Sequence, residues 1–184
     1  MRCMEGPADI ENLDLAALRI LHYPDPRLTE VSKPVRRFDE PLRGLAEKMF
    51  ELMFAARGVG LAASQVGVPI RMFVASPAFQ EQDRRVYVNP RVLSAEDWQE
   101  EEEGCLSFPS ITCKIKRHKV VVLEAGNLAG AVFQETGEGL TARIFEHEMD
   151  HLEGRLLVNR MGSVARLTRR KALKELEAEF AEGR

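Results

Sequence analysis

The spacing of apolar and polar positions in the first third of the chain predicts one long helix. Asp39 followed by Pro41 is a typical helix start, because aspartate caps a first turn and proline fits its first position. Gly58 supplies a stop signal. Between them, apolar residues recur at helical spacing on one face, namely Leu42, Leu45, Met49 and Met53. We expect this face to pack on the core.

Four short runs further along have the composition of β-strands. They are rich in β-branched and apolar residues, and they cover positions 71–75, 85–88, 119–124 and 131–134. Between them, positions 96–103 are strongly acidic, which is typical of a solvated loop. The sequence therefore predicts short, mostly antiparallel strands.

Two more helices are expected in the last third. One begins near Thr141 and ends at Gly154. The other covers 163–180 and has an apolar side formed by Leu167, Leu173, Leu176 and Phe180. Together with the strands, these helices indicate an α+β fold in which the strands surround the central 141–154 helix and a further helix follows at the C-terminus.

The domain organisation is simple. Residues 1–17 have weak periodicity and a Gly6-Pro7 break, so they form an N-terminal extension of unknown role with a short helix near 13–18. A chain of 184 residues with 45% apolar composition fits one substantial core. We expect residues 18–184 to form one domain.

Charge and hydropathy exclude several classes of partner. With 26 basic and 29 acidic residues the net charge is −3, which implies no general attraction to DNA or to an anionic membrane. No apolar run approaches membrane-spanning length, and the opening residues carry Glu5, Asp9 and Glu11 where a signal peptide would need an apolar stretch. These features predict a cytoplasmic protein.

The segment with the most chemistry is His147-Glu148-Met149-Asp150-His151. On a helix His147 and His151 lie one turn apart on one face, where they can share a metal ion, and Glu148 lies beside them. A divalent metal lowers the pKa of bound water, and a neighbouring carboxylate can take the proton. The alternative is a chance H-E-x-x-H sequence on a charged helix with solvated histidines.

A catalytic metal site needs a third protein ligand. Downstream of His151 the chain offers neither histidine nor cysteine, and Glu153 is too close on the same helix. Upstream, Cys105 follows Gly104 and offers a thiolate, a strong ligand for zinc or ferrous iron. The alternative for Cys105 is a small buried apolar residue. Cys113 is a weaker candidate, because its alternating surroundings indicate packing.

Three segments resemble the signature motifs of the peptide deformylases, in that family's order and spacing. They are Gly58-Val59-Gly60-Leu61-Ala62-Ala63-Ser64-Gln65, Glu103-Gly104-Cys105-Leu106-Ser107 and His147-Glu148-Met149-Asp150-His151. The resemblance extends over roughly residues 18 to 165 and includes the start at Leu18 to Leu28 and the pair Asn89-Pro90. One motif alone could be accidental, whereas three in order point to the family.

The resemblance implies a role for each motif position. Peptide deformylases remove the formyl group from the N-terminal methionine of nascent polypeptides and release formate. Cys105, His147 and His151 would hold one divalent metal, with Fe(2+) as the native ion and Zn(2+) or Ni(2+) also accepted. Glu148 would act as general base and then as general acid. The side-chain amide of Gln65 and the backbone N–H of Leu106 would stabilise the oxyanion.

The substrate would be a formyl-methionyl peptide that pairs its backbone with the enzyme as an added strand. Val59 and Gly60 would permit this close approach. By resemblance, Val59 and Leu140 would line part of the methionine pocket, although a leucine before a helix is more often part of the core.

The chain also departs from the family pattern. Glu146 stands where a glutamine is usual, Arg143 lies near where many relatives have an apolar residue, and Thr112 replaces a substrate-contacting arginine of some relatives. Arg143 would reach solvent or pair with a carboxylate, and a pocket-facing guanidinium would alter the methionine preference. An ion pair between Glu103 and Arg117 is a further hypothesis.

Two other functions remain open at this point. The same machinery could cleave a different amide bond, or the chain could be a non-catalytic metal-binding or ribosome-associated module. The basic residues Arg166, Arg169, Arg170, Lys171 and Lys174 are compatible with a transient contact with ribosomal RNA. The alternative for this basic stretch is a solvated face balanced by nearby glutamates, which is the more common situation.

Overall fold

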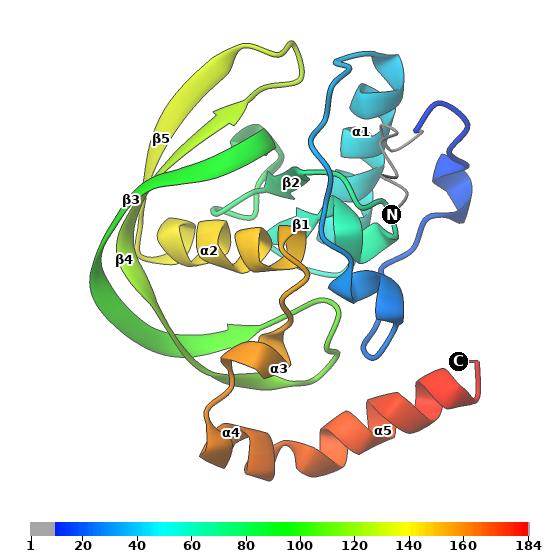
Figure 1. Ribbon diagram of the computed structural model, residues 1–184, viewed down its shortest axis with the longest axis vertical. Helices are drawn as coiled ribbons and strands as arrows, with labels where there is room; N and C mark the ends of the chain where they lie inside the picture. The colour runs from blue at the N-terminus through cyan, green and yellow to red at the C-terminus, as the bar shows by residue number, and fades with distance from the viewer. Residues whose placement is uncertain (1–9, 184) are drawn as a thin grey trace, which may run out of the picture.

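A five-stranded antiparallel sheet organises the fold in the computed structural model, which describes residues 10–183 (Figure 1). Each strand pairs with the next in the sequence, so that the spatial order is β1-β2-β3-β4-β5. The strands are β1 Gly60–Ala62, β2 Met72–Ala75, β3 Arg85–Gly104, β4 Thr112–Gly126 and β5 Val132–Glu138. The predicted α+β class with antiparallel strands is confirmed. Cys3 and the Gly6-Pro7 break lie outside the described residues.

Strands β3 and β4 are much longer than the sequence predicted. The acidic positions 96–103 belong to β3, so the expected loop is wrong. Non-local pairing explains the difference: Glu100 lies opposite Lys116 and Glu102 lies opposite Lys114 across the ladder. Opposite charges on facing positions stabilise an antiparallel pair of strands. A prediction from neighbouring residues alone does not include this partner strand.

Helix α2, Leu140–Leu152, lies against the curved inner face of β3, β4 and β5 (Figure 1). Its bounds agree with the prediction to within two residues. Gly154 ends it with a left-handed backbone, φ 69°, which a glycine adopts without strain. The sheet thus encloses the helix that carries both histidines.

Helix α1, Glu40–Ala55, contributes one apolar face to the hydrophobic core. Its predicted apolar face is confirmed, because Leu42, Leu45, Met49 and Met53 are all fully buried. The predicted stop at Gly58 is wrong. Arg57 takes the left-handed conformation after the helix, with φ 57°, whereas a Cβ on Gly58 would press against Leu106.

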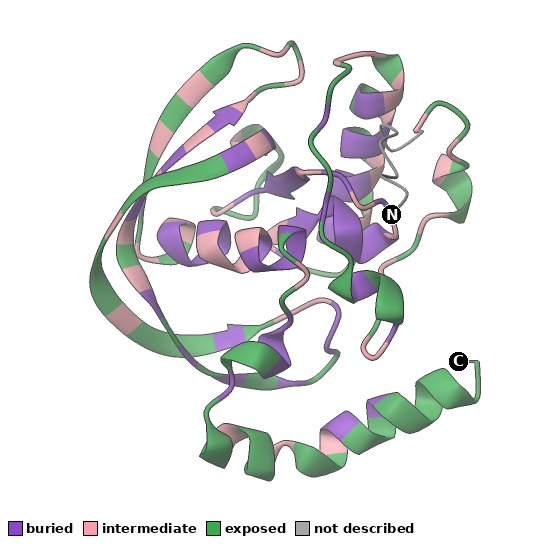
Figure 2. Ribbon diagram, in the orientation of Figure 1, coloured by how far each residue is buried: buried purple, intermediate pink, exposed green. Residues whose placement is uncertain are grey.

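The C-terminal region contains three short helices instead of one long helix after α2. They are α3 Leu157–Arg160, α4 Ser163–Thr168 and α5 Arg170–Ala181. The break between α4 and α5 falls at Arg169, whose Nε donates to the carbonyl of Thr112 at 2.8 Å. Only Leu173 and Leu176 of the predicted apolar side are buried, and Figure 2 shows most of α4 and α5 exposed.

The remaining elements are 3-10 helices: η1 Leu15–Ala17, η2 Pro26–Thr29, η3 Ala63–Val66 and η4 Glu81–Asp83. The short helix expected near 13–18 is therefore the three-residue η1, capped by the side chain of Asp14. Ile10, Leu13 and Leu15 pack against the α1 core. None of the helices within residues 10–183 combines the length and apolarity needed to span a bilayer.

Candidate metal centre and active site

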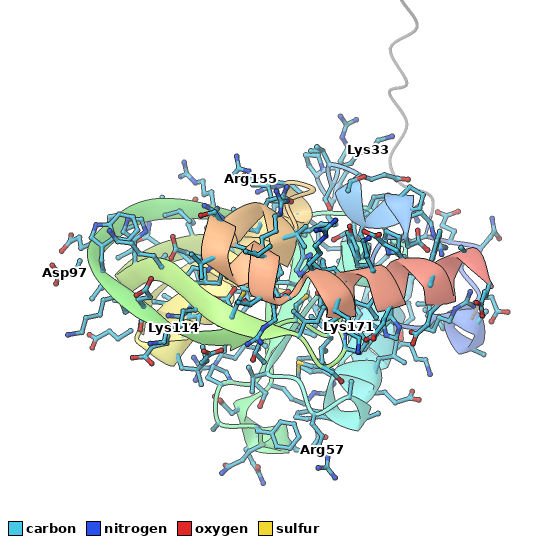
Figure 3. All side chains as sticks on the ribbon, turned by 90° about the horizontal axis from the view of Figure 1, so that it is seen from below. Lys33, Arg57, Asp97, Lys114, Arg155 and Lys171 are labelled. Carbon is cyan, nitrogen blue, oxygen red and sulfur yellow. The ribbon has the colours of Figure 1, made fainter. Side chains whose placement is uncertain are left out.

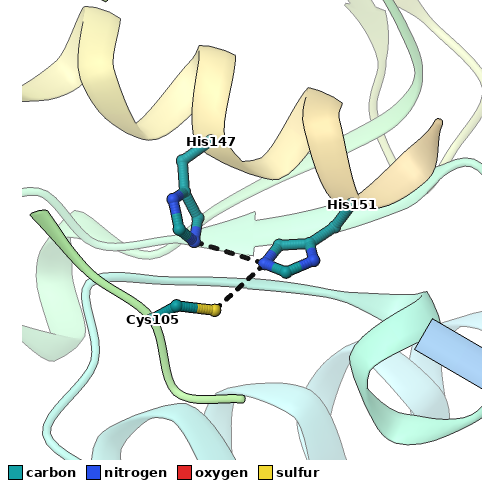
Figure 4. A group of neighbouring side chains, drawn as sticks. All are labelled: Cys105, His147 and His151. Carbon is teal, nitrogen blue, oxygen red and sulfur yellow. Dashed lines mark hydrogen bonds between the residues drawn. The ribbon is translucent and has the colours of Figure 1, made fainter. Parts of the chain in front are cut away.

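Three side chains from two distant segments converge on one point (Figure 4). His147 and His151 come from successive turns of α2, and Cys105 directly follows the end of β3. The Nε2 atom of His151 lies 3.2 Å from the Cys105 Sγ and 3.3 Å from the His147 Nε2. The ligand atoms of all three residues lie within 4.8 Å of one another.

This geometry fits a metal ion. Zinc-type bonds of about 2.0–2.3 Å in a tetrahedral arrangement place neighbouring ligand atoms about 3.3–3.6 Å apart. The two separations in the site, 3.2 and 3.3 Å, are close to that value, and both ring Nε2 atoms face the sulfur side of the site. A thiolate with two imidazoles is a donor set for a divalent transition metal.

Glu103 orients the first histidine of this group. Its Oε1 lies 2.7 Å from the Nδ1 of His147, which leaves the Nε2 atom to face the other two ligand atoms. A carboxylate behind a ligating histidine fixes the ring and its tautomer. Arg117 binds the same carboxylate through Nη2 at 2.7 Å and Nε at 3.1 Å, so the hypothesised ion pair is confirmed.

The buried charge network extends on both sides of Glu103. Arg143 donates from Nη1 to Glu103 Oε2 at 2.8 Å and to the carbonyl of Ile115 at 3.2 Å. Arg117 also reaches Asp150 at 2.6 Å, and Asp150 accepts from Arg160 Nε at 2.9 Å. Burial opposes ionisation of Glu103, but the hydrogen bonds from His147 and Arg117 hold its pKa well below the usual value. The network therefore keeps Glu103 an anion.

Glu148 lies in a different environment from Glu103. It is 3% exposed, and its Oε2 has no hydrogen-bond partner within residues 10–183. Burial raises the pKa of Glu148 to about 7. A carboxyl group with a pKa near neutrality can both accept and return a proton at working pH.

Two hydrogen-bond donors lie next to Cys105. Gln65, at the end of η3, accepts from the Ala62 N–H at 2.9 Å and donates to Ser107 Oγ at 3.1 Å. Its Nε2 lies 3.6 Å from the Cys105 Sγ. The N–H of Leu106 donates to no acceptor among the described residues. Both donors are therefore placed beside the ligand cysteine.

A cavity of about 560 Å³ opens over this site, a size typical of pockets for small ligands. It is lined by the motif residues Val59, Gly60, Gln65, Cys105, Leu106, His147 and Glu148, and also by Leu140, Arg143 and Ile144. The interpretation of Leu140 as core is wrong, because its side chain is 52% exposed. The residues expected to act in catalysis, metal binding and substrate binding therefore all line one cavity, with the exception of His151. His151 does not line the cavity, but its ring lies against Cys105 and His147.

A family model described as polypeptide deformylase matches residues 17–167, most of the chain. The chain belongs to the peptide deformylase family. A peptide deformylase of Acidobacterium capsulatum is 44% identical over 149 residues, which cover 80% of this chain and 88% of the relative.

Solved structures agree. Peptide deformylase 1B of Arabidopsis thaliana, crystallised with an inhibitor, superposes with a TM-score of 0.86 at 37% identity and covers 90% of this chain and 93% of its own. Peptide deformylase of Plasmodium falciparum gives a TM-score of 0.87 at 33% identity, covering 89% and 98% of the two chains.

The departures from the deformylase pattern now have structural explanations. Arg143 does not reach solvent, because it is 5% exposed and bound to Glu103. Glu146 faces β4, where it accepts from the backbone N–H of His118 at 2.6 Å and lies 2.7 Å from the His118 Nδ1. Thr112 lines the cavity. Cys113 is buried in the core, as its alternating surroundings predicted.

Sequence reasoning missed the roles of Asp150 and Ser107. Asp150 joins the buried arginines, and Ser107 anchors the Gln65 amide. Both residues stand inside the deformylase motifs, and this position in the sequence could have pointed to their roles.

Proposed function

We propose that this chain is a deformylase that hydrolyses the N-formyl group from the N-terminal formyl-methionine of nascent polypeptides and releases formate. One observation carries the proposal: Cys105, His147 and His151 meet beside the buried Glu148 and the Gln65 amide, around the cavity of a chain that belongs to the deformylase family. A purely structural metal site would have no use for a buried proton acceptor or a neighbouring amide donor.

Cys105, His147 and His151 would hold one divalent metal per chain. We assign Fe(2+) as the native ion, with Zn(2+) and Ni(2+) as substitutes, because a soft thiolate with two imidazoles suits all three. When bound, the metal lowers the pKa of a water and polarises a carbonyl.

Glu148 handles the proton in this reaction. It takes the proton from the attacking water as the oxygen bonds to the formyl carbon, and then returns it to the amine nitrogen as the carbon–nitrogen bond breaks. Gln65 and the Leu106 N–H donate to the oxygen on which negative charge develops. The products are formate and a free methionine amine.

The cavity wall orients the peptide. Among residues 10–183, β1 pairs only with β2, so its other edge, at Val59 and Gly60, can accept an added strand. Leu140 and Ile144 give an apolar surface for the methionine side chain. We assign catalysis to residues 18–184 and leave residues 1–17 without a functional role.

We place the reaction in the cytoplasm, where nascent chains carry formyl-methionine, with no DNA or membrane partner. Contact with the ribosome would use the exposed Arg170, Lys171 and Lys174 of α5, since Figure 3 shows Lys171 on the outer side of that helix. Arg166 and Arg169 donate to carbonyls within the chain. Binding of ribosomes by the wild type, and its loss when these three residues become glutamine, tests the contact.

Substitution of Glu148 tests the chemistry. Glu148→Ala should reduce formate release from formyl-Met-Ala-Ser by at least about 100-fold while one metal per chain stays bound, because the carboxylate carries the proton but is not a ligand. Metal content is measured on anaerobically purified protein. Turnover unchanged by Glu148→Ala would refute the assigned role, and release of amine from unformylated peptides would indicate a peptidase instead.

A further inference from the structure

We propose that Arg57 selects substrates with an acidic side chain at the third residue of the peptide. This inference deepens the proposed function and rests on it. Arg57 lies on the rim of the cavity, directly before the Gly58 to Gln65 motif, and it takes no part in the metal site or the proton transfer.

The direction of β1 determines where the substrate chain leaves the site. Gly60 lies against the Glu148 carboxylate, so the formyl end of the peptide must lie beside Gly60. In one direction along β1 follow Leu61 and Ala62, which are fully buried. The peptide can therefore leave only in the other direction, past Val59 towards Arg57, antiparallel to β1.

The spacing of an extended chain then identifies the substrate residue beside Arg57. The ladder continues one residue before β1, since the carbonyl of Val59 accepts from Ser76 N–H at 2.9 Å. A peptide paired with this edge advances by about 3.3 Å per residue, so its third residue lies about 7 Å beyond the residue opposite Gly60. Arg57 stands at that end of the edge, in the left-handed turn that follows α1. With methionine opposite Gly60, the third residue lies opposite Gly58, within reach of the long arginine side chain.

The charge of Arg57 is available to a substrate. Its side chain is exposed, and it forms no ion pair with any carboxylate among residues 10–183 (Figure 3). Glu102, which also lines the cavity, lies opposite Lys114 in the β3–β4 ladder, where opposite charges attract each other. The rim of the cavity therefore presents an uncompensated positive charge on the β1 side.

Peptides that differ only at the third residue test this inference. We expect kcat/KM for formyl-Met-Ala-Glu to exceed that for formyl-Met-Ala-Gln by about two- to five-fold at low salt, the range of an exposed ion pair. Formyl-Met-Ala-Lys should fall below both. The preference should shrink as the salt concentration rises, because exposed charges are screened.

Variants separate the possible outcomes. Arg57→Gln should abolish the ranking, Arg57→Glu should reverse it and Arg57→Lys should keep it, whereas Arg36→Gln, an equal charge change at another exposed arginine, should leave it unchanged. Equal kcat/KM for the Glu, Gln and Lys peptides, with formate released from all three, would overturn the inference and leave the proposed function intact. Absence of formate from every peptide would refute the proposed function, and the specificity would fall with it.

Discussion

The carboxylate of Glu148 lies directly against the backbone of Gly60. A Cβ on Gly60 would collide with Glu148 Oε1 and press against Ile144. The sequence suggested that this glycine admits the substrate backbone. The structure adds that the missing side chain also makes room for the carboxylate of Glu148, the proposed proton carrier.

Gly60→Ala should therefore damage the chemical step. The added methyl group displaces the Glu148 carboxylate, and general acid–base catalysis contributes about 10²–10⁴-fold, so kcat should fall by about 100-fold or more. Steady-state formate release gives kcat and KM separately. If Gly60 served only the approach of the substrate, KM would rise and kcat would stay constant.

A matched glycine provides the control. Gly162 has an ordinary backbone conformation, and a Cβ built on it meets nothing within 4 Å. Gly162→Ala should leave kcat unchanged. An equal loss in both variants would show that the Gly60 effect is not specific to Glu148.

Local sequence patterns identified the parts of the fold that local interactions determine. The α1 face follows from helical spacing, and the end of α2 follows from Gly154. Cys105 was predicted as the third ligand because a two-histidine helix requires a third donor, and the structure places its Sγ 3.2 Å from the His151 Nε2. Each of these conclusions depends on residues close in sequence or on simple coordination chemistry.

The features that sequence reasoning missed depend on distant partners. The acidic part of β3 is a strand because Lys114 and Lys116 lie opposite it. The helix break at Arg169 coincides with a hydrogen bond to Thr112, 57 positions away. Arg143 looked out of place near an apolar pocket because its partner, Glu103, is 40 positions away. No window of local sequence contains these pairs.

Removal of Arg143 should weaken both the fold and the metal site. Arg143→Met removes one of the guanidinium groups paired with the buried Glu103. Breaking such a buried ion pair lowers the free energy of unfolding by about 3 kcal/mol. Since Glu103 orients His147, metal affinity should fall by about tenfold. Denaturant unfolding and competition with a chelator measure the two effects. Exposed Arg36→Met should change neither, and an unchanged affinity in Arg143→Met would remove Arg143 from the orientation of His147.

The side-chain amide of Gln65 should matter as a donor. Gln65→Glu keeps an oxygen that accepts from the Ala62 N–H but loses the N–H groups beside Cys105. Loss of one oxyanion donor costs about 10²–10³ in kcat. Ser107→Ala removes the anchor of the amide and leaves the amide itself, so it should cost less. Equal losses in Gln65→Glu and Ser107→Ala would mean that Gln65 acts only by holding the loop.

Removing and restoring the metal should distinguish Cys105, the proposed ligand, from Cys113, which lies in the core. Stripping the wild type with a chelator should abolish formate release, and Fe(2+) under anaerobic conditions, Zn(2+) or Ni(2+) should restore it. Because an ion that binds only the folded chain stabilises it, each metal should also raise the unfolding temperature of the wild type. Cys105→Ala should show no such rise, since its two remaining ligands bind weakly. Cys113→Ala, in the buried core, should bind one metal per chain like the wild type, and full metal occupancy in Cys105→Ala would contradict the assigned ligand set.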